Sequence, residues 1–162
     1  MVRPYKLRPS QQRWRSGSSV IEVVFAFQVL MLLAFGMVEF GQYFYIRHAF
    51  EGAARDGARL AILPSATQTA VNTVMLSTLK QALPNLTSFN TSWLAMTQTD
   101  PVTGSSTSLS DIANASAGNE VTIKLSAAYD TLPGVYRPLY AITTKGIANG
   151  KQVTGQATMV KE

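Results

Sequence analysis

The sequence contains no cysteine and a single histidine, His48. These absences exclude disulfides, a thiol nucleophile and cysteine-based metal sites. One imidazole also leaves little from which to build a catalytic triad or a zinc centre. The acidic residues of the C-terminal part are scattered, with nothing at metal-ligand spacing: Asp100, Asp111, Glu120 and Asp130. We therefore expect no catalytic residues, no metal, no cofactor and no enzymatic activity.

An excess of positive charge is confined to the N-terminal tail. The chain has 14 lysines and arginines against nine acids. Five of the basic residues precede residue 18, with no acid among them, and the remaining nine balance the nine acids. The pI of about 9.7 therefore reflects a basic leader over residues 1–17. No basic stripe follows this leader, so we expect no nucleic-acid partner.

Proline is absent from residues 18–63, and charge is absent from residues 23–38. Apolar character continues past Glu39 to Ile46, which gives an apolar segment of 24 residues. As a helix this segment measures about 36 Å, enough to cross a hydrocarbon core of about 30 Å. Because the basic tail precedes the segment, we expect a single-pass anchor in a lipid bilayer. The N-terminus should lie in the cytoplasm and the C-terminal part outside.

The end of the apolar segment has the composition of a membrane boundary. Tyr43, Phe44 and Tyr45 are typical of an interfacial aromatic belt. Glu39 lies 17 residues beyond Glu22, about 25 Å along a helix, and is expected near the same outer boundary.

A cleaved secretory signal is the alternative interpretation of a basic tail followed by apolar residues. The apolar core of such a signal is about 7 to 15 residues long and ends at a small-x-small site. Ala34 and Gly36 could form that site, but they lie inside the apolar run, and helical sequence continues well past them. The sequence favours an anchor over a secretory signal.

The helix is expected to continue beyond the membrane. Residues 47–63 are rich in alanine, arginine and leucine, which favour helix, and Pro64 ends it. Glu51 and Arg55 are spaced four apart for an ion pair on an exposed face. The sequence thus predicts a helix over residues 18–63, about 69 Å long, with a stalk that projects from the bilayer.

Four glycines interrupt this helix, and each costs about 1 kcal/mol relative to alanine. Small residues let the backbones of neighbouring helices approach closely. Two of the four lie within about 20° of each other around the axis, as one packing seam requires. A bend or local flexibility explains the glycines equally well. The helix-packing candidates are Gly36, Gly41, Gly52 and Gly57.

A carboxylate stands at the start of the apolar segment, within the sequence RSGSSVIEVVF. Glu22 inside a spanning helix would cost about 2.5 to 3.5 kcal/mol, so it should have a partner or a task. The alternative is that Glu22 only interacts favourably with the dipole at the N-terminus of the helix. This sequence resembles the processing site of type IV pilins and pseudopilins, at which a membrane peptidase cuts after a glycine. The resemblance lies in the spacing, in which Gly17 is followed by four residues and then Glu22. This resemblance implies that Ser18 becomes the N-terminus. Its amine could then pair with Glu22 of a neighbouring subunit and set the register of a helical bundle.

The whole helix resembles the N-terminal signature of TadE-like proteins, minor pseudopilins associated with tight-adherence (Flp) pili. The chain reads VIEVVFAF at the start, GMVEFG in the middle and GAARDGARLA at the end, so the resemblance covers about residues 15–62. It departs from the family pattern after Glu22 and again at Gln28 and Val29, where the family often has a proline.

The resemblance implies a function in pilus assembly. Its expected partners are a prepilin peptidase, other pilin or pseudopilin subunits and a pilus assembly platform in the inner membrane. The rival hypothesis is an uncleaved single-pass membrane protein whose extracytoplasmic domain binds a ligand.

The remaining sequence, residues 64–162, predicts a small extracytoplasmic α+β domain. A helix should begin near Ser65 or Thr67, end at Pro84 and bury one apolar face. Strands are expected over residues 87–99, 121–127 and 151–162, with turns after residue 99 and an irregular connection over 132–150. We therefore expect one helix on an antiparallel sheet of about three strands. Core or edge packing is the preferred role for four aromatic residues, with a recognition patch as the alternative: Trp93, Tyr129, Tyr136 and Tyr140.

Overall fold

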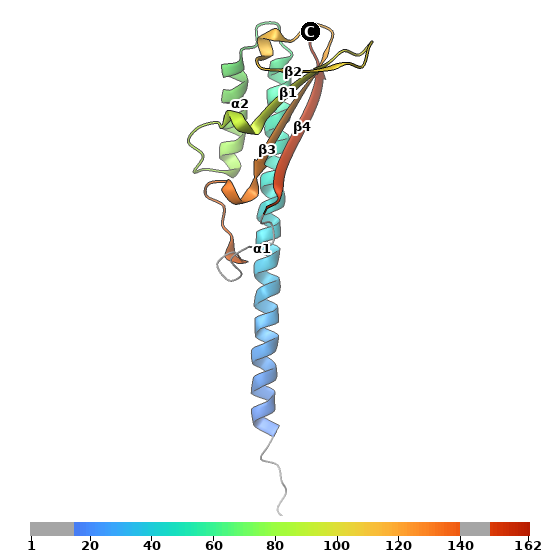
Figure 1. Cartoon of the computed structure of the whole chain (residues 1–162). Helices are drawn as coiled ribbons and strands as arrows, with labels where there is room; N and C mark the ends of the chain where they lie inside the picture. Colours follow the sequence, from blue (N-terminus) through green and yellow to red (C-terminus); the bar gives the residue numbers. More distant parts are fainter. Residues whose placement is uncertain (1–14, 140–149) are drawn as a thin grey trace, which may run out of the picture.

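The computed structural model describes residues 15–139 and 150–162, with side chains from residue 19 onward. Most of the expected leader, and Tyr140, therefore lie outside the described residues. One long helix runs the length of the molecule, and a second helix and a four-stranded sheet lie against its C-terminal half (Figure 1). The α+β fold class is confirmed. Its main elements are α1 (Arg15–Ala61), α2 (Gln68–Ala82), β1 (Leu94–Thr99), β2 (Ser106–Leu109), β3 (Glu120–Ala128) and β4 (Gln152–Val160).

Helix α1 contains 47 residues and agrees closely with the predicted helix. At about 1.5 Å per residue it is about 70 Å long. Its C-terminal carbonyl groups are capped from the far end of the chain: Nζ of Lys161 donates to the carbonyl oxygens of Ala61 at 2.9 Å and Leu63 at 3.0 Å. A cation at a helix C-terminus also interacts favourably with the helix dipole. The last residues of the chain are thereby attached to the end of α1.

The sheet is antiparallel, with strand order β2-β1-β3-β4. The predicted alternation in β3 is present, because Val121, Ile123 and Leu125 are fully buried. About three strands were expected. The additional strand, β2, lies in the segment for which turns were expected. Its serine and threonine residues are mostly exposed and show no apolar alternation, so the sequence pattern does not indicate a strand there.

The predicted strand over residues 87–99 begins later than expected. Asn90 Oδ1 accepts a hydrogen bond from the Ser92 backbone N–H at 3.0 Å and caps the short 3-10 helix Thr91–Trp93. Strand β1 then starts at Leu94. Because an asparagine side chain can cap the backbone in this way, it competes locally with strand formation.

Helix α2 has the predicted N-cap and the predicted apolar face. Thr67 Oγ1 accepts a hydrogen bond from the Ala70 N–H at 3.3 Å, and Val71, Met75 and Leu79 are buried. This face packs against α1.

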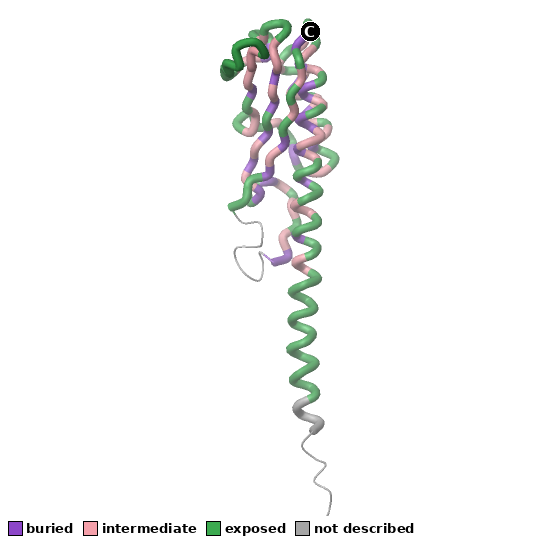
Figure 2. The backbone as a smooth tube through the Cα atoms, turned by 90° about the vertical axis from the view of Figure 1, so that its right-hand side faces the viewer, coloured by how far each residue is buried: buried purple, intermediate pink, exposed green. Residues whose placement is uncertain are grey.

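The C-terminal half of α1 contributes to the domain core (Figure 2). It lies between α2 and the inner face of β3 and β4. Four alanines on this half are fully buried, and their small side chains permit close packing on both sides. These are Ala53, Ala54, Ala58 and Ala61.

Strand β4 crosses α1 in direct backbone contact at Gly155. A Cβ atom at this position would overlap the carbonyl group of Phe50 and the backbone nitrogen of Glu51. Backbone atoms cannot move aside as the end of a flexible side chain can, so the strand and the helix would have to separate. Gly155 is therefore required for β4 to lie on α1.

Replacing Gly155 with alanine should destabilise the domain by about 3 kcal/mol or more. The measurement is chemical unfolding of the full chain in detergent micelles, followed by circular dichroism. Gly41→Ala is the matched control, because a Cβ at Gly41 meets nothing within 4 Å. That change should raise stability by up to about 1 kcal/mol. Wild-type unfolding of Gly155→Ala would show that the two backbones do not meet.

Candidate functional site

The N-terminal half of α1 is a bare apolar rod. We call residues 19–38 the exposed half of α1, since every side chain in it is exposed or half-buried (Figure 2). Its large apolar residues include Val23 at 65%, Phe25 at 65% and Met37 at 73% exposure. Twenty helical residues measure about 30 Å, the thickness of a bilayer hydrocarbon core.

Such an apolar surface must be shielded from water by another apolar surface. Soluble monomers seldom expose contiguous apolar patches larger than a few hundred Å². A core helix of a soluble protein would be buried inside the domain, whereas this half lies outside it. Among the described residues, α1 is also the one helix long and apolar enough to cross a membrane. The exposed half of α1 is therefore a single candidate membrane anchor.

Glu39 marks the point at which the domain first meets α1. Its side chain is only 1% exposed, and its carboxylate accepts a hydrogen bond from the Leu139 N–H at 3.2 Å. The sequence placed Glu39 near a membrane boundary but gave no sign of its burial, because its partner lies 100 residues further along the chain.

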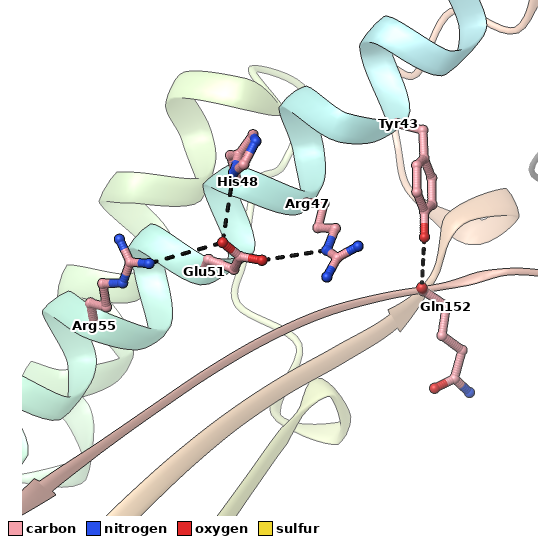
Figure 3. Close-up of polar contacts among 6 residues, drawn as sticks. All are labelled: Tyr43, Arg47, His48, Glu51, Arg55 and Gln152. Carbon is pink, nitrogen blue, oxygen red and sulfur yellow. Dashed lines mark hydrogen bonds and ion pairs between the residues drawn. The ribbon is translucent and has the colours of Figure 1, made fainter.

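The region where α1 contacts the rest of the domain, which we call the junction, continues one helical turn beyond Glu39 through aromatic side chains. The rings of Tyr43 and Tyr129 pack edge to face with centroids 5.4 Å apart. The Tyr43 hydroxyl donates to the Gln152 carbonyl oxygen at 3.3 Å (Figure 3). Burial raises the pKa of Tyr129, and the charge of Glu39 adds to this effect while Arg137 opposes it. Tyr129 is thus a buried, neutral part of the junction.

Arg137 fastens the segment over residues 132–139 to the rest of the domain. Its guanidinium lies 5.3 Å from the centre of the Tyr129 ring. It donates hydrogen bonds to the carbonyl oxygens of Tyr129 at 2.6 Å, Asp130 at 2.7 Å and Leu132 at 3.2 Å. Charged donors form stronger hydrogen bonds than neutral donors, so these contacts hold the segment firmly.

The expected aromatic belt is divided between two roles. Phe44 and Tyr45 are exposed, as residues at a membrane surface would be, and Phe40 joins them. Tyr43 is half-buried against the domain. The hydroxyl of Tyr45 donates to the Gln81 carbonyl oxygen at 3.3 Å, so this residue contacts both α2 and the surroundings.

A polar cluster on α1 follows the belt (Figure 3). The Glu51 carboxylate lies 3.4 Å from Arg47, 3.6 Å from His48 and 4.0 Å from Arg55. Exposed pairs of this kind contribute up to about 1 kcal/mol each. The cluster therefore shows which face of the helix remains in water.

The residues expected to take part in processing lie at the start of α1. The helix begins at Arg15, so the backbone of Gly17 and Ser18 is helical, although their side chains are outside the described residues. Glu22 is exposed at the beginning of the exposed half of α1. Cleavage at Gly17 and a register role for Glu22 stay predictions.

The four helix-packing glycines differ in their surroundings. A Cβ at Gly57 would lie 2.8 Å from Met75 on α2, so this glycine permits close packing within the chain. At Gly52 the nearest atom would be Thr78 Cγ2 at 3.7 Å, an ordinary contact. Gly36 is half-buried and Gly41 is exposed. Their role between subunits stays a prediction.

Two structural residues were missed by sequence reasoning. Gly155 stands alone inside the strand pattern QVTGQATMV, and an isolated glycine in a strand indicates a close backbone approach. That signal was present. Lys161 gave no signal, because a penultimate lysine is ordinarily solvated.

A family model described as TadE-like protein matches residues 17–59. The match is confined to the N-terminal helix. The match confirms the resemblance deduced from the sequence and covers about a quarter of the chain. No curated protein and no solved structure matches the chain.

The matched segment includes residues from both halves of α1. Its first part is the exposed half, and its GMVEFG step places Glu39 where the domain begins. Its GAARDGARLA close supplies buried alanines and Gly57, at which α2 approaches. The TadE-like pattern thus contains one stretch for an apolar environment and one for the domain core.

A small pocket lies beside the junction, lined in part by Gln42, Ile46, Leu83 and Val135. Its volume of about 60 Å³ is far below the roughly 300 to 1,000 Å³ of small-molecule sites. This pocket therefore gives no support to a ligand-binding function.

Proposed function

We propose that this chain is a minor pseudopilin of a Tad (Flp) pilus system, anchored in the inner membrane and active in pilus assembly or its initiation. A prepilin peptidase cuts between Gly17 and Ser18. The processed helix then joins other pilin or pseudopilin subunits on the assembly platform. The activity is assembly and not catalysis.

One observation carries this proposal: the TadE-like match falls on a helix whose exposed apolar half is about as long as a bilayer core is thick. The family match indicates an association with Tad pili. The basic residues before the helix favour an N-terminus in the cytoplasm and a domain outside.

The apolar surface of the exposed half of α1 is covered differently in the single subunit and in the assembled bundle. In the single subunit, lipid covers the exposed half of α1. In the assembled bundle, helices of neighbouring subunits cover it. Lipid and the helical bundle are both apolar environments, so moving from one to the other exposes no apolar area to water. Helix packing and polar contacts therefore decide whether the helix prefers the bundle.

Cleavage would create a charge that requires a partner. The new amine at Ser18 is positive and would lie at the positive end of the helix dipole, which is unfavourable. Glu22 lies four residues, or about 6 Å, further along the helix. A neighbouring subunit shifted by about that distance would bring its Glu22 beside this amine, and the pair would set the axial register.

Intact-mass measurement of the chain tests this function directly. The protein from cells that contain the prepilin peptidase should lack residues 1–17, and the protein from peptidase-deficient cells should retain them. The rival hypothesis, an uncleaved membrane protein with a ligand-binding domain, predicts the same mass in both strains. Equal masses would therefore refute the proposal.

A further inference from the structure

We propose that residues 132–139 form a second contact with the membrane, in which Tyr136 enters the headgroup region beside the point where α1 leaves the bilayer. This inference rests on the proposed membrane anchoring of α1. It adds a lipid-binding surface on the domain itself.

The height of this segment along α1 follows from its contacts. Gly134 and Val135 line a pocket with Gln42 and Ile46 of α1, and Leu139 is bonded to Glu39. The segment therefore descends along α1 toward the exposed half. Tyr136 lies between these two attachments, at about the level of residues 39 to 46 of α1.

That level coincides with the headgroup region. If residues 19–38 fill the hydrocarbon core, Glu39 and Gln42 lie within about 6 Å of its edge. The polar layer on each side of a bilayer is about 5 to 8 Å thick. The lower part of the segment then lies in this layer.

The side chain of Tyr136 has the exposure that such a contact needs. It is 62% exposed, whereas Leu132 and Leu139 at the ends of the segment are buried. Arg137 holds the adjacent backbone through three carbonyl groups. A tyrosine presented by a fixed backbone suits the headgroup region, because its ring is apolar and its hydroxyl is polar.

The second contact would fix the rotation of the domain about α1. A single helix in a bilayer can turn about its own axis. A contact beside the axis prevents that rotation and presents one defined side of the domain to neighbouring subunits. Glu39, which is bonded to the end of the segment, acts as a positioning residue.

The absence of cysteine permits a direct test by single-site labelling. A Tyr136→Cys chain carries an environment-sensitive fluorophore in phosphatidylethanolamine and phosphatidylglycerol vesicles that each hold at most one protein molecule. Headgroup-labelled quencher lipid should reduce its emission at least about twofold. A Phe40→Cys probe on α1, two residues beyond the expected edge of the hydrocarbon core, should be quenched similarly.

A probe at Val102 serves as the water-exposed control. Val102 is 90% exposed in the turn between β1 and β2, and this turn lies at the end of the domain remote from the exposed half of α1 (Figure 1). Its emission should not change. If the Tyr136 probe behaves like the Val102 probe while the Phe40 probe is quenched, the second contact is refuted and the anchor stands. If the Phe40 probe also escapes quenching, the membrane anchor itself is refuted.

Glu39→Ala tests how the segment is held. The Leu139 N–H loses an acceptor, so quenching at position 136 should fall toward the value at position 102 while quenching at position 40 remains. Circular dichroism of the same samples verifies the fold. Unchanged quenching at position 136 in the folded variant would refute the positioning role of Glu39.

Discussion

A Gly17→Val chain is expected to retain residues 1–17 in every molecule. The proposed scissile bond, between Gly17 and Ser18, lies in helical backbone, because α1 begins at Arg15. A peptidase needs an extended and accessible backbone, and glycine eases local unwinding because it disfavours helix by about 1 kcal/mol. Valine adds a branched side chain directly beside the bond. Intact-mass measurement on membranes from peptidase-containing cells should show the full-length mass alone.

Gly41→Val is the matched control for this change. Gly41 belongs to the same helix, and added side-chain atoms meet open space at Cβ. Processing of this variant should equal that of the wild type. Normal trimming of Gly17→Val would place the cleavage site elsewhere in the chain.

Glu22→Gln should lower incorporation into pilus or assembly fractions at least about tenfold, with normal membrane insertion and processing. Glutamine keeps the shape of the side chain and removes its charge. The amine of Ser18 in a neighbouring subunit would then be buried in the bundle without a counter-ion, and a penalty of about 1.4 kcal/mol already corresponds to tenfold. The measurement is an immunoblot of the sheared pilus fraction against the membrane fraction.

Glu51→Gln provides the comparison for the loss of one carboxylate. Glu51 lies in the exposed polar cluster with Arg47, His48 and Arg55, well away from the processed end. Its variant should be incorporated as well as the wild type. Equal incorporation of Glu22→Gln would show that this glutamate does not set the register.

The sequence predicted those parts of the fold that depend on local patterns. The long helix follows from the absence of proline over residues 18–63, α2 from the cap at Thr67, and β3 from the alternation after Glu120. Strand β2 could not be predicted, since its pairing with β1 depends on backbone hydrogen bonds between polar, exposed residues. Such pairing carries no hydrophobic signal.

The sequence predicted an apolar segment long enough to span a membrane, but it did not predict where that segment ends. The apolar segment was counted to Ile46, yet Ile46 is 3% exposed and belongs to the domain core. The uninterrupted exposed stretch ends at residue 38, because Glu39 and Tyr43 form hydrogen bonds with segments about 100 residues away. Contacts over such distances are invisible to sequence periodicity, and they decide where the anchor stops.

We expect residues 19–38 to lie in a membrane with the C-terminal domain outside. Single cysteines placed along α1 and at position 102 test this expectation in intact cells with a permeable outer envelope, through reaction with a membrane-impermeant maleimide. Cysteines at positions 27 and 33 should be protected, and those at positions 55 and 102 should react fully. Labelling at 27 and 33 as fast as at 102, or recovery of the chain in the soluble fraction, would contradict the account.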